Sequence, residues 1–282
     1  MKNIYQGKLA LVTGGSSGIG FEIVKDLYKQ GCSIIILARN KEKLDFAKNS
    51  LTSHQSDPDQ SVWTYSVDVA DFAIVQGVAD KVVSSAGLPD FIFNCAGVAR
   101  PGYVEELPIE VYKWTMDIDY HGTVNVTQAF LPGLIKRGSG HIINISSMAG
   151  VIGAFGYTAY SGAKFAVRGF TDTLRAELKP KGIQVSIVFP PDTDTPQLTW
   201  ETQFKPPETA ILAGSDKPLK ADYVAQTILN DVARNKYVIV PGWNAKLLYW
   251  LATHLGGLIY PIMDLLIKDA TNKSSSTRKP QD

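Results

Sequence analysis

The 282-residue chain contains little cysteine, little histidine and almost no net charge. Its two cysteines, Cys32 and Cys95, lie in apolar runs with neither CxxC spacing nor a disulfide framework, so we expect a reducing compartment. The four histidines have no spacing to one another that is typical of metal ligands, and no metal is predicted. A net charge of +1 gives no electrostatic footprint for nucleic acid. The N-terminal stretch also lacks the apolar core of a signal peptide.

The composition that remains is typical of a folded protein, with 45% hydrophobic and 20% charged residues. The length suits one large α/β domain. Apolar runs that predict strands alternate with helical patterns, and the longest helix is expected over residues 108–136. This alternation predicts an α/β fold with a single Rossmann-type, doubly wound parallel sheet of about seven strands and helices on both faces. The predicted strands are residues 8–13, 33–37, 62–67, 90–93, 141–145, 183–189 and 237–240.

A glycine-rich loop, residues 14–20 (GGSSGIG), follows the first predicted strand and precedes a helical pattern that stops at Gly31. Glycines allow a sharp turn and a close approach to a pyrophosphate, while the helix N-terminus offers unpaired N–H groups. Because strand, glycines and helix occur in this order, we predict a dinucleotide site here. The residues assigned to it are Gly14, Ser16, Ser17, Gly18, Ile19 and Gly20.

The end of the second predicted strand carries Arg39. An acidic residue at this point hydrogen-bonds the adenosine ribose, whereas an arginine accommodates a 2′-phosphate. Arg39, supported by Ser16 and Lys43, therefore favours NADPH/NADP+ over NADH/NAD+. The alternative is that Arg39 is simply a surface charge at the end of a strand.

Polar and small residues also follow the third and fourth predicted strands. Asp68 either hydrogen-bonds the adenine amino group or N-caps the helix that starts near Asp71. Asn94 is interpreted as a brace for the sheet end, and the small residues after it allow close approach of a dinucleotide. The residues assigned to the cofactor in these two segments are Asp68, Val69, Asn94, Ala96 and Gly97.

The stretch 147–164 carries Ser147, Tyr160 and Lys164, with the tyrosine thirteen positions after the serine and the lysine four further on. A four-residue step places Tyr160 and Lys164 on one face of a helix. An unperturbed phenol has a pKa of about 10, and a neighbouring cation lowers it. A serine hydroxyl that reaches the same point can hold a carbonyl oxygen while the phenol donates its proton. These residues together predict the reduction of a ketone.

Several motifs in order resemble the short-chain dehydrogenase/reductase family: TGGSSGIG at 13–20, NCAG at 94–97, Ser147, the YxxxK pair and a proline turn after the sixth strand. The resemblance covers roughly residues 5–240. It implies that Ser147 positions the carbonyl, that Tyr160 donates the proton, and that Lys164 lowers the tyrosine pKa and binds the nicotinamide ribose. The thirteen-residue spacing selects Ser147 over Ser146. Pro190 and Thr193 of the proline turn are assigned to the cofactor, as are Tyr160 and Lys164.

One position departs from the family pattern. The family usually has an asparagine in the long helix, where it supports a proton-relay water, and the segment IDYHGT places Asp119 there. An aspartate still accepts a hydrogen bond from water, but its charge near the lysine is expected to alter the tyrosine pKa. Asp119 is therefore included with the catalytic residues.

A narrower resemblance is carried by PPDTDTPQL at 190–198, GYTAYSGAKFAVRGF at 156–170 and KPPET at 205–209. These segments are similar to the 3-ketodihydrosphingosine reductases, a group within that family. The resemblance implies NADPH-dependent reduction of the C3 ketone of a long-chain sphingoid base in sphingolipid synthesis. Another lipophilic carbonyl, such as a steroid or retinoid, and a non-catalytic NADP(H)-binding scaffold are the alternatives. PPDTDTP also reads simply as a rigid loop rich in Pro and Asx turns.

The chain after residue 192 differs in character from the rest. Residues 193–219 are proline-rich and are expected to be an irregular lid over the site. Residues 247–263 contain no Asp, Glu, Lys or Arg but are interrupted by glycines and a proline, so the length is just short of a membrane span. Aromatic and lysine residues flank the segment, which predicts a broken helix lying in or dipping into a membrane surface. The alternative is packing in an oligomer interface.

These patterns divide the chain into three parts. Residues 1–242 are predicted to form the reductase domain with its lid, 243–269 a hydrophobic membrane-associating segment, and 270–282 a disordered tail. The protein is expected on a membrane facing the cytoplasm, the endoplasmic reticulum in a eukaryote, or at the inner membrane or in the cytoplasm in a bacterium. A homodimer or homotetramer is compatible with these features.

Overall fold

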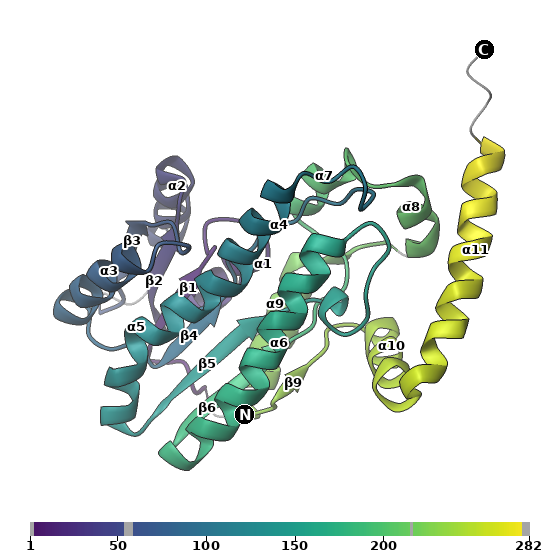
Figure 1. Cartoon of the computed structure of the whole chain (residues 1–282). Helices are drawn as coiled ribbons and strands as arrows, with labels where there is room; N and C mark the ends of the chain where they lie inside the picture. The colour runs from purple at the N-terminus through teal and green to yellow at the C-terminus, as the bar shows by residue number, and fades with distance from the viewer. Residues whose placement is uncertain (1–2, 54–58, 215–216, 278–282) are drawn as a thin grey trace.

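The computed structural model describes residues 3–53, 59–214 and 217–277 of the chain. Its centre is a seven-stranded parallel sheet in the order β3-β2-β1-β4-β5-β6-β9, with helices on both faces (Figure 1). The predicted α/β fold is therefore confirmed. The strands are β1 (Leu9–Thr13), β2 (Ser33–Ala38), β3 (Val62–Ser66), β4 (Phe91–Asn94), β5 (Gly140–Ile145), β6 (Ile183–Val188) and β9 (Val238–Ile239).

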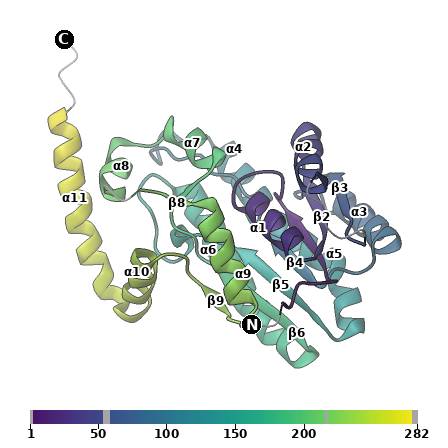
Figure 2. The same cartoon turned by 180° about the vertical axis from the view of Figure 1, so that it is seen from behind.

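The side chains of each strand alternate between the two faces of the sheet, and each face is covered by its own set of helices. Val12 of β1 points into a core shared with α1 (Gly18–Lys29), α2 (Lys41–Thr52) and α9 (Ala221–Val232). Its neighbour Leu11 points into a second core shared with α3 (Phe72–Ser85), α5 (Gly122–Arg137) and α6 (Thr158–Leu178). Successive side chains of a strand face opposite sides of the sheet, so one apolar strand supplies both cores. Seen from behind, α1 and α9 lie in front of the sheet (Figure 2).

The long helix expected over residues 108–136 has a different inner structure. It consists of α4 (Ile109–Thr115), the π-helical segment η1 (Met116–His121) and α5, and the backbone stays helical at both junctions. A π-helical turn widens the helix locally and often occurs at functional sites. Here the widened turn contains Asp119, which is completely buried.

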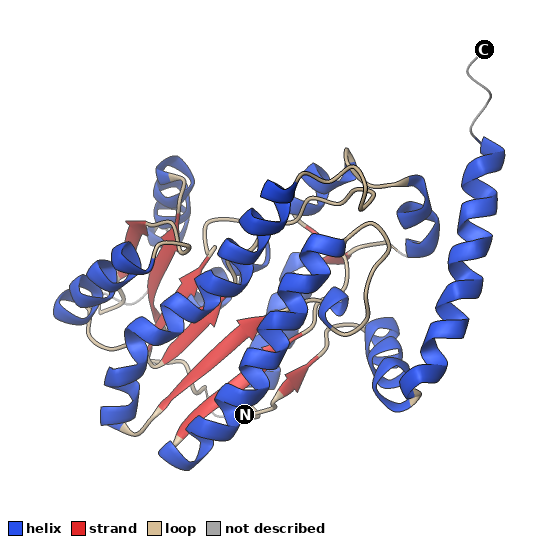
Figure 3. Cartoon of the chain, in the orientation of Figure 1, coloured by secondary structure: helices blue, strands red, loops and turns tan. Residues whose placement is uncertain are grey.

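The segment 193–219, expected to be irregular, contains regular elements. The short strands β7 (Thr193–Asp194) and β8 (Leu219–Lys220) pair with each other, and α7 (Pro196–Thr202) and α8 (Pro207–Ala213) lie between them. Figure 3 shows these helices beyond the end of the main sheet. Both helices begin at a proline, which fits the first helical position because its fixed φ suits a helix and no N–H is needed there. Two of the prolines that suggested a loop, Pro196 and Pro207, are therefore helix starts.

The C-terminal segment is a pair of helices, α10 (Trp243–His254) and α11 (Ile259–Thr277), separated by the turn η4 (Gly256–Leu258). Figure 1 shows α11 standing at one edge of the molecule beside α8. The expectation of a disordered tail from residue 270 is wrong as far as Thr277, because Ala270 and Ser274 are buried and Ser274 donates a hydrogen bond to Glu208 of α8. Residues 278–282 lie outside the described residues. Among the described residues, the helices are all too short or too polar to cross a membrane.

Candidate active site

A cavity of about 780 Å³ opens at the carboxyl ends of β1, β4, β5 and β6, where a doubly wound sheet is expected to bind its ligands. One end is formed by the glycine loop and the other by α7, α8, α10 and α11. The predicted site residues that line it are Gly14, Ser17, Gly18, Ile19, Gly20, Ala96, Gly97, Ser147, Tyr160, Lys164, Pro190 and Thr193.

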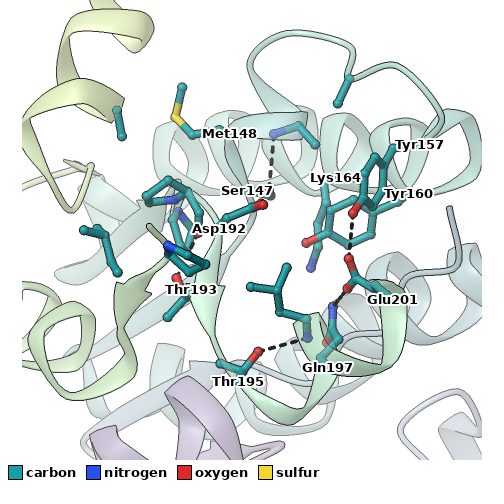
Figure 4. A pocket seen from close by; sticks show the side chains of 18 of the residues that line it. Ser147, Met148, Tyr157, Tyr160, Lys164, Asp192, Thr193, Thr195, Gln197 and Glu201 are labelled. Atoms are coloured by element: carbon teal, nitrogen blue, oxygen red, sulfur yellow. Dashed lines mark hydrogen bonds between the residues drawn. The ribbon is translucent and has the colours of Figure 1, made fainter. Parts of the chain in front are cut away.

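The three residues predicted for catalysis meet in this cavity (Figure 4). Ser147 follows β5, and its hydroxyl accepts the N–H of Ala149 at 3.2 Å. Tyr160 and Lys164 lie one turn apart on α6, with the lysine Nζ 5.4 Å from the centroid of the tyrosine ring. Ser146 is turned away, because its Oγ donates to the Lys164 backbone carbonyl at 2.9 Å. The geometry thus agrees with the choice of Ser147 over Ser146.

Lys164 is held by a buried ion pair. Its Nζ lies 3.2 Å from Asp119 Oδ2 and donates to the Ile145 carbonyl at 3.2 Å, while Asp119 Oδ1 accepts the Val98 N–H at 2.7 Å. Burial raises the pKa of Asp119, and the Lys164 charge and the Val98 N–H oppose that rise. A buried ion pair is tolerated where such hydrogen bonds complete its surroundings. The π-helical turn therefore connects α5 to Lys164 through Asp119.

The pKa of Tyr160 differs from the expectation based on sequence. Burial raises it well above its usual range, the charges of Asp119 and Glu201 raise it further, and the hydrogen bond with Ser147 lowers it. Lys164 was expected to lower this pKa, but its ammonium group faces Asp119. An influence of Asp119 on this pKa was predicted from the sequence without a direction, and the Asp119 charge raises the pKa. The buried phenol keeps its proton, which suits a group that must donate one.

The glycine loop has the backbone that a dinucleotide pyrophosphate requires. Gly14 has φ +66°, and a Cβ there would lie 3.0 Å from the Ala96 Cα. A Cβ at Gly20 would lie 2.5 Å from the Gly14 carbonyl oxygen, so the loop and α1 pack without side chains between them. The α1 N-cap, Ser17, makes no side-chain capping bond, which leaves first-turn N–H groups facing the cavity. These residues fit a dinucleotide.

The remaining predicted cofactor residues lie outside the cavity lining. Arg39 and Lys43 are exposed after β2 and at the start of α2, and neither forms an ion pair with a described residue. Asp68 is exposed and accepts the Ala70 N–H at 3.0 Å. The N-cap of α3 is Asp71, whose side chain accepts from Ile74, so the capping interpretation of Asp68 is wrong. Ser16 is partly buried in the glycine loop. Val69, which follows β3 in the chain, is buried.

Asn94 is a brace for the sheet, as interpreted. Its amide donates to Asn144 Oδ1 of β5 at 2.8 Å and to Thr127 Oγ1 of α5 at 3.2 Å. Asn94 pairs in register with Thr13 on one side and Asn144 on the other, so it ties three central strands to a helix. This bracing fixes the edge from which Ser147 and the glycine loop project.

A second polar cluster in the cavity went unrecognised in the sequence. The carboxyl group of Glu201 accepts the Tyr157 hydroxyl at 2.8 Å and the Gln197 amide at 2.8 Å (Figure 4). Asp192 pairs with Lys205 at 3.4 Å, and Lys205 also lies over the Tyr157 ring. Gln197 and Glu201 are four residues apart, a spacing that would have suggested a helix face if the segment had not been taken for a loop.

The sheet, the strand-end cavity and the serine–tyrosine–lysine cluster define a dinucleotide-dependent oxidoreductase. Comparison with known proteins gives the family. Residues 8–205 match the family model described as short chain dehydrogenase. The chain belongs to this family and is an oxidoreductase of the kind that acts on a ketone or an alcohol.

Two relatives and one solved structure illustrate the match. The chain is 39% identical to the Bos taurus 3-ketodihydrosphingosine reductase over 232 residues, which cover 82% of this chain and 70% of that protein. It is 36% identical to the Dictyostelium discoideum 3-ketodihydrosphingosine reductase, with 93% and 83% covered. A short-chain dehydrogenase from Sphingobium yanoikuyae in complex with NADPH has the same fold, with a TM-score of 0.73, 22% identity and 98% of each chain covered.

Proposed function

We propose that this protein reduces the C3 ketone of 3-ketodihydrosphingosine to the alcohol with NADPH. The observation that carries the proposal is the extent of the cavity. It runs from Ser147 and Tyr160 to apolar side chains of the C-terminal helices, among them Leu248 of α10 and Met263 of α11. A long-chain ketone needs a polar reacting end joined to an apolar channel. The names of the relatives and the PPDTDTPQL segment support the same substrate.

The residues of the chain divide the reaction between them. Bound NADPH supplies a hydride to the carbonyl carbon. Ser147 donates a hydrogen bond that holds the carbonyl oxygen, and Tyr160 donates the proton to that oxygen as the alcohol forms. Lys164, held by Asp119 and the Ile145 carbonyl, binds the nicotinamide ribose and positions the neighbouring phenol. Proton transfer from a positioned side chain typically accelerates such a step by about 10²–10⁴-fold.

NADPH rather than NADH is proposed from Arg39 and Lys43. Both are exposed near the end of β2, where an arginine suits a 2′-phosphate. The Sphingobium yanoikuyae structure, named as an NADPH complex, shares this fold. The glycine loop and the N-terminus of α1 would hold the pyrophosphate.

The C-terminal helices are proposed to dock on the cytoplasmic surface of a membrane. Trp243, Leu258, Tyr260 and Leu265 are between 66% and 78% exposed. Helices α10 and α11, which carry all of them except Leu258 of η4, also line the cavity. Tryptophan and tyrosine suit the boundary between lipid and water, and leucines suit the acyl region. A lipid substrate would then enter the cavity from the bilayer without crossing water.

The test of the reaction is NADPH oxidation with 3-ketodihydrosphingosine in detergent micelles, with the product identified by mass spectrometry. We expect one dihydrosphingosine per NADPH consumed. A much higher kcat/KM for a steroid or retinoid ketone would replace the proposed substrate. Tight NADPH binding without turnover of any ketone would favour the scaffold alternative.

The test of the membrane contact is flotation with phospholipid vesicles. The double variant Leu258→Glu/Leu265→Glu should lose vesicle binding, because both side chains are exposed and neither lines the cavity. Ile74→Glu/Val83→Glu, two exposed apolar residues of α3, is the matched control and should float as the wild type does. The outcome would instead identify an oligomer interface if the wild type does not bind vesicles but forms dimers, and these dimers dissociate in Leu258→Glu/Leu265→Glu.

A further inference from the structure

Among the described residues, two acidic side chains line the cavity, Asp192 and Glu201, whereas Asp119 lies behind Lys164 and outside the lining. Asp192 is half exposed and has a partner, since Lys205 Nζ lies 3.4 Å from its carboxylate. Glu201 is only 6% exposed and forms no ion pair with any lysine, arginine or histidine of the described residues. Its two oxygens accept hydrogen bonds from neutral groups, Tyr157 and Gln197.

A buried carboxylate without a cation is costly, since hydrogen bonds from neutral donors replace only part of its lost hydration. Burial accordingly raises the pKa of Glu201, while Gln197, Tyr157 and then Lys205 oppose the rise. A positively charged ligand in the cavity would supply the missing countercharge. The ionised carboxylate would then have both its hydrogen bonds and an ion pair.

Glu201 also lies close to the reacting groups. Its partner Tyr157 packs against Tyr160 with 5.8 Å between the ring centroids. The Glu201 charge also raises the pKa of the Tyr160 phenol. Figure 4 shows the Glu201 carboxyl group reaching toward these two tyrosines from α7, on the far side of the open space from Thr193. A cation that contacts Glu201 would therefore lie next to the carbonyl that Tyr160 protonates.

We propose that Glu201 recognises a primary ammonium group on the carbon adjacent to the reacting ketone. This inference rests on the proposed function, whose substrate carries an amino group at that carbon. Gln197 and Tyr157 hold the carboxylate in place, and the ammonium group approaches it from the cavity. Glu201 is thus a specificity-determining residue that distinguishes an α-amino ketone from a plain long-chain ketone.

The experiment compares two substrates that differ by one group: 3-ketodihydrosphingosine and the same hydroxyketone with hydrogen in place of the amino group. In the wild type, kcat/KM should favour the amino ketone. In Glu201→Gln this preference should fall by about 10- to 100-fold, which is the usual size of a hydrogen bond to a charged group. The loss should appear chiefly in KM for the amino ketone.

Glu208→Gln is the matched control. Glu208 is another buried glutamate that accepts a tyrosine hydroxyl, Tyr103 at 2.7 Å, but it does not line the cavity. Its substitution should change both substrates alike and leave their ratio at the wild-type value. A ratio that falls equally in both variants would contradict the proposal, because it would show a general effect of losing a buried carboxylate.

The outcomes separate this inference from the proposed function. If the wild type does not reduce the amino ketone, the proposed function fails. If it does so but Glu201→Gln keeps the wild-type ratio, only the role of Glu201 is wrong. Should Glu201→Gln not fold, as judged by its melting temperature, Glu201→Asp keeps the charge but retracts it by one methylene. The ratio should then fall partly, and an unchanged ratio would overturn the proposal.

Discussion

The two ends of the cavity differ in what forms their surface, which is mainly backbone at one end and side chains at the other. At the dinucleotide end, backbone atoms and glycines of the loop between β1 and α1 and of the first turn of α1 form the surface, and Asn94 braces the strands beneath it. At the substrate end, side chains from the short helices α7 and α8 and from the C-terminal pair α10 and α11 form the surface. The first end can accept a ligand shared by a whole family, whereas the second can distinguish one ketone from another. General chemistry and specificity thus reside in separate parts of the chain.

The strongest test of this division is removal of the proposed proton donor, Tyr160, which lies between the two ends. Tyr160→Phe should lower kcat by about 10²–10⁴-fold, because the general acid is lost. NADPH affinity, measured by the change in cofactor fluorescence, should fall far less than kcat, because Tyr160 is only one of the residues assigned to the cofactor. Tyr103→Phe, which removes a hydroxyl bonded to Glu208 outside the cavity, should keep near-normal turnover. Near-normal turnover in Tyr160→Phe would mean that another group donates the proton.

The dinucleotide end is tested separately by Arg39→Asp. Reversing this charge should lower kcat/KM for NADPH by about 10- to 100-fold, since a charged hydrogen bond to the 2′-phosphate is replaced by repulsion. The value for NADH should remain close to that of the wild type. Lys48→Asp makes the same charge change on an exposed part of α2 and should affect neither cofactor. Equal losses with both cofactors in Arg39→Asp would remove the 2′-phosphate role.

Asp119→Asn tests the link between the π-helical turn and the phenol. The Asp119 charge raises the pKa of Tyr160, so a neutral amide should lower that pKa. Reduction requires the protonated phenol, and the alkaline limb of the kcat/KM profile should therefore move to lower pH. Asp117→Asn, an exposed aspartate in the same turn, should leave the profile in place. A shift in the opposite direction would show that the loss of the ion pair repositions Lys164.

A smaller effect, a loss of local stability, is expected from a substitution at the outer edge of the substrate end. Ala270 is buried where α11 packs against α8, so Ala270→Arg should overpack that contact and cost about 1–3 kcal/mol. Because α11 lies at the edge, the loss should appear as faster amide hydrogen exchange in α11 and α8 rather than in the sheet. Asn272→Arg, on the exposed side of the helix, is the control. Faster exchange throughout the sheet would show that α11 belongs to the main cooperative unit.

The sheet, and the meeting of Ser147, Tyr160 and Lys164 in one cavity, could be predicted from the sequence because both depend on local patterns. Short apolar runs are long enough to identify buried strands, and the steps from Ser147 to Tyr160 and Lys164 place those residues without knowledge of the rest of the fold. The position of Gly14 and its loop at the cavity depends on the same kind of local pattern. Each of these features needs only a strand, a turn and the start of a helix.

The predictions that differed depend on contacts between distant segments. The pKa of Tyr160 is set by Asp119 and Glu201, which lie 41 residues before it and 41 after it in the chain. The helical continuation of α11 depends on Ala270 and Ser274 reaching α8. Prolines 196 and 207 suggested a loop, since a proline at a helix start and a proline in a turn look alike in a single sequence.

The pairing of β7 with β8 has a consequence for how such a protein can change. Thr193 of β7 pairs with Leu219 of β8, so the two ends of the α7–α8 segment are hydrogen-bonded to each other in a small two-stranded sheet. A segment anchored at a single base can be lengthened, shortened or exchanged without altering the strands that hold Ser147 and the glycine loop. The β7–β8 pairing thus allows the α7–α8 part of the substrate end to vary, and with it the choice of ketone, while the sheet and the glycine loop stay unchanged.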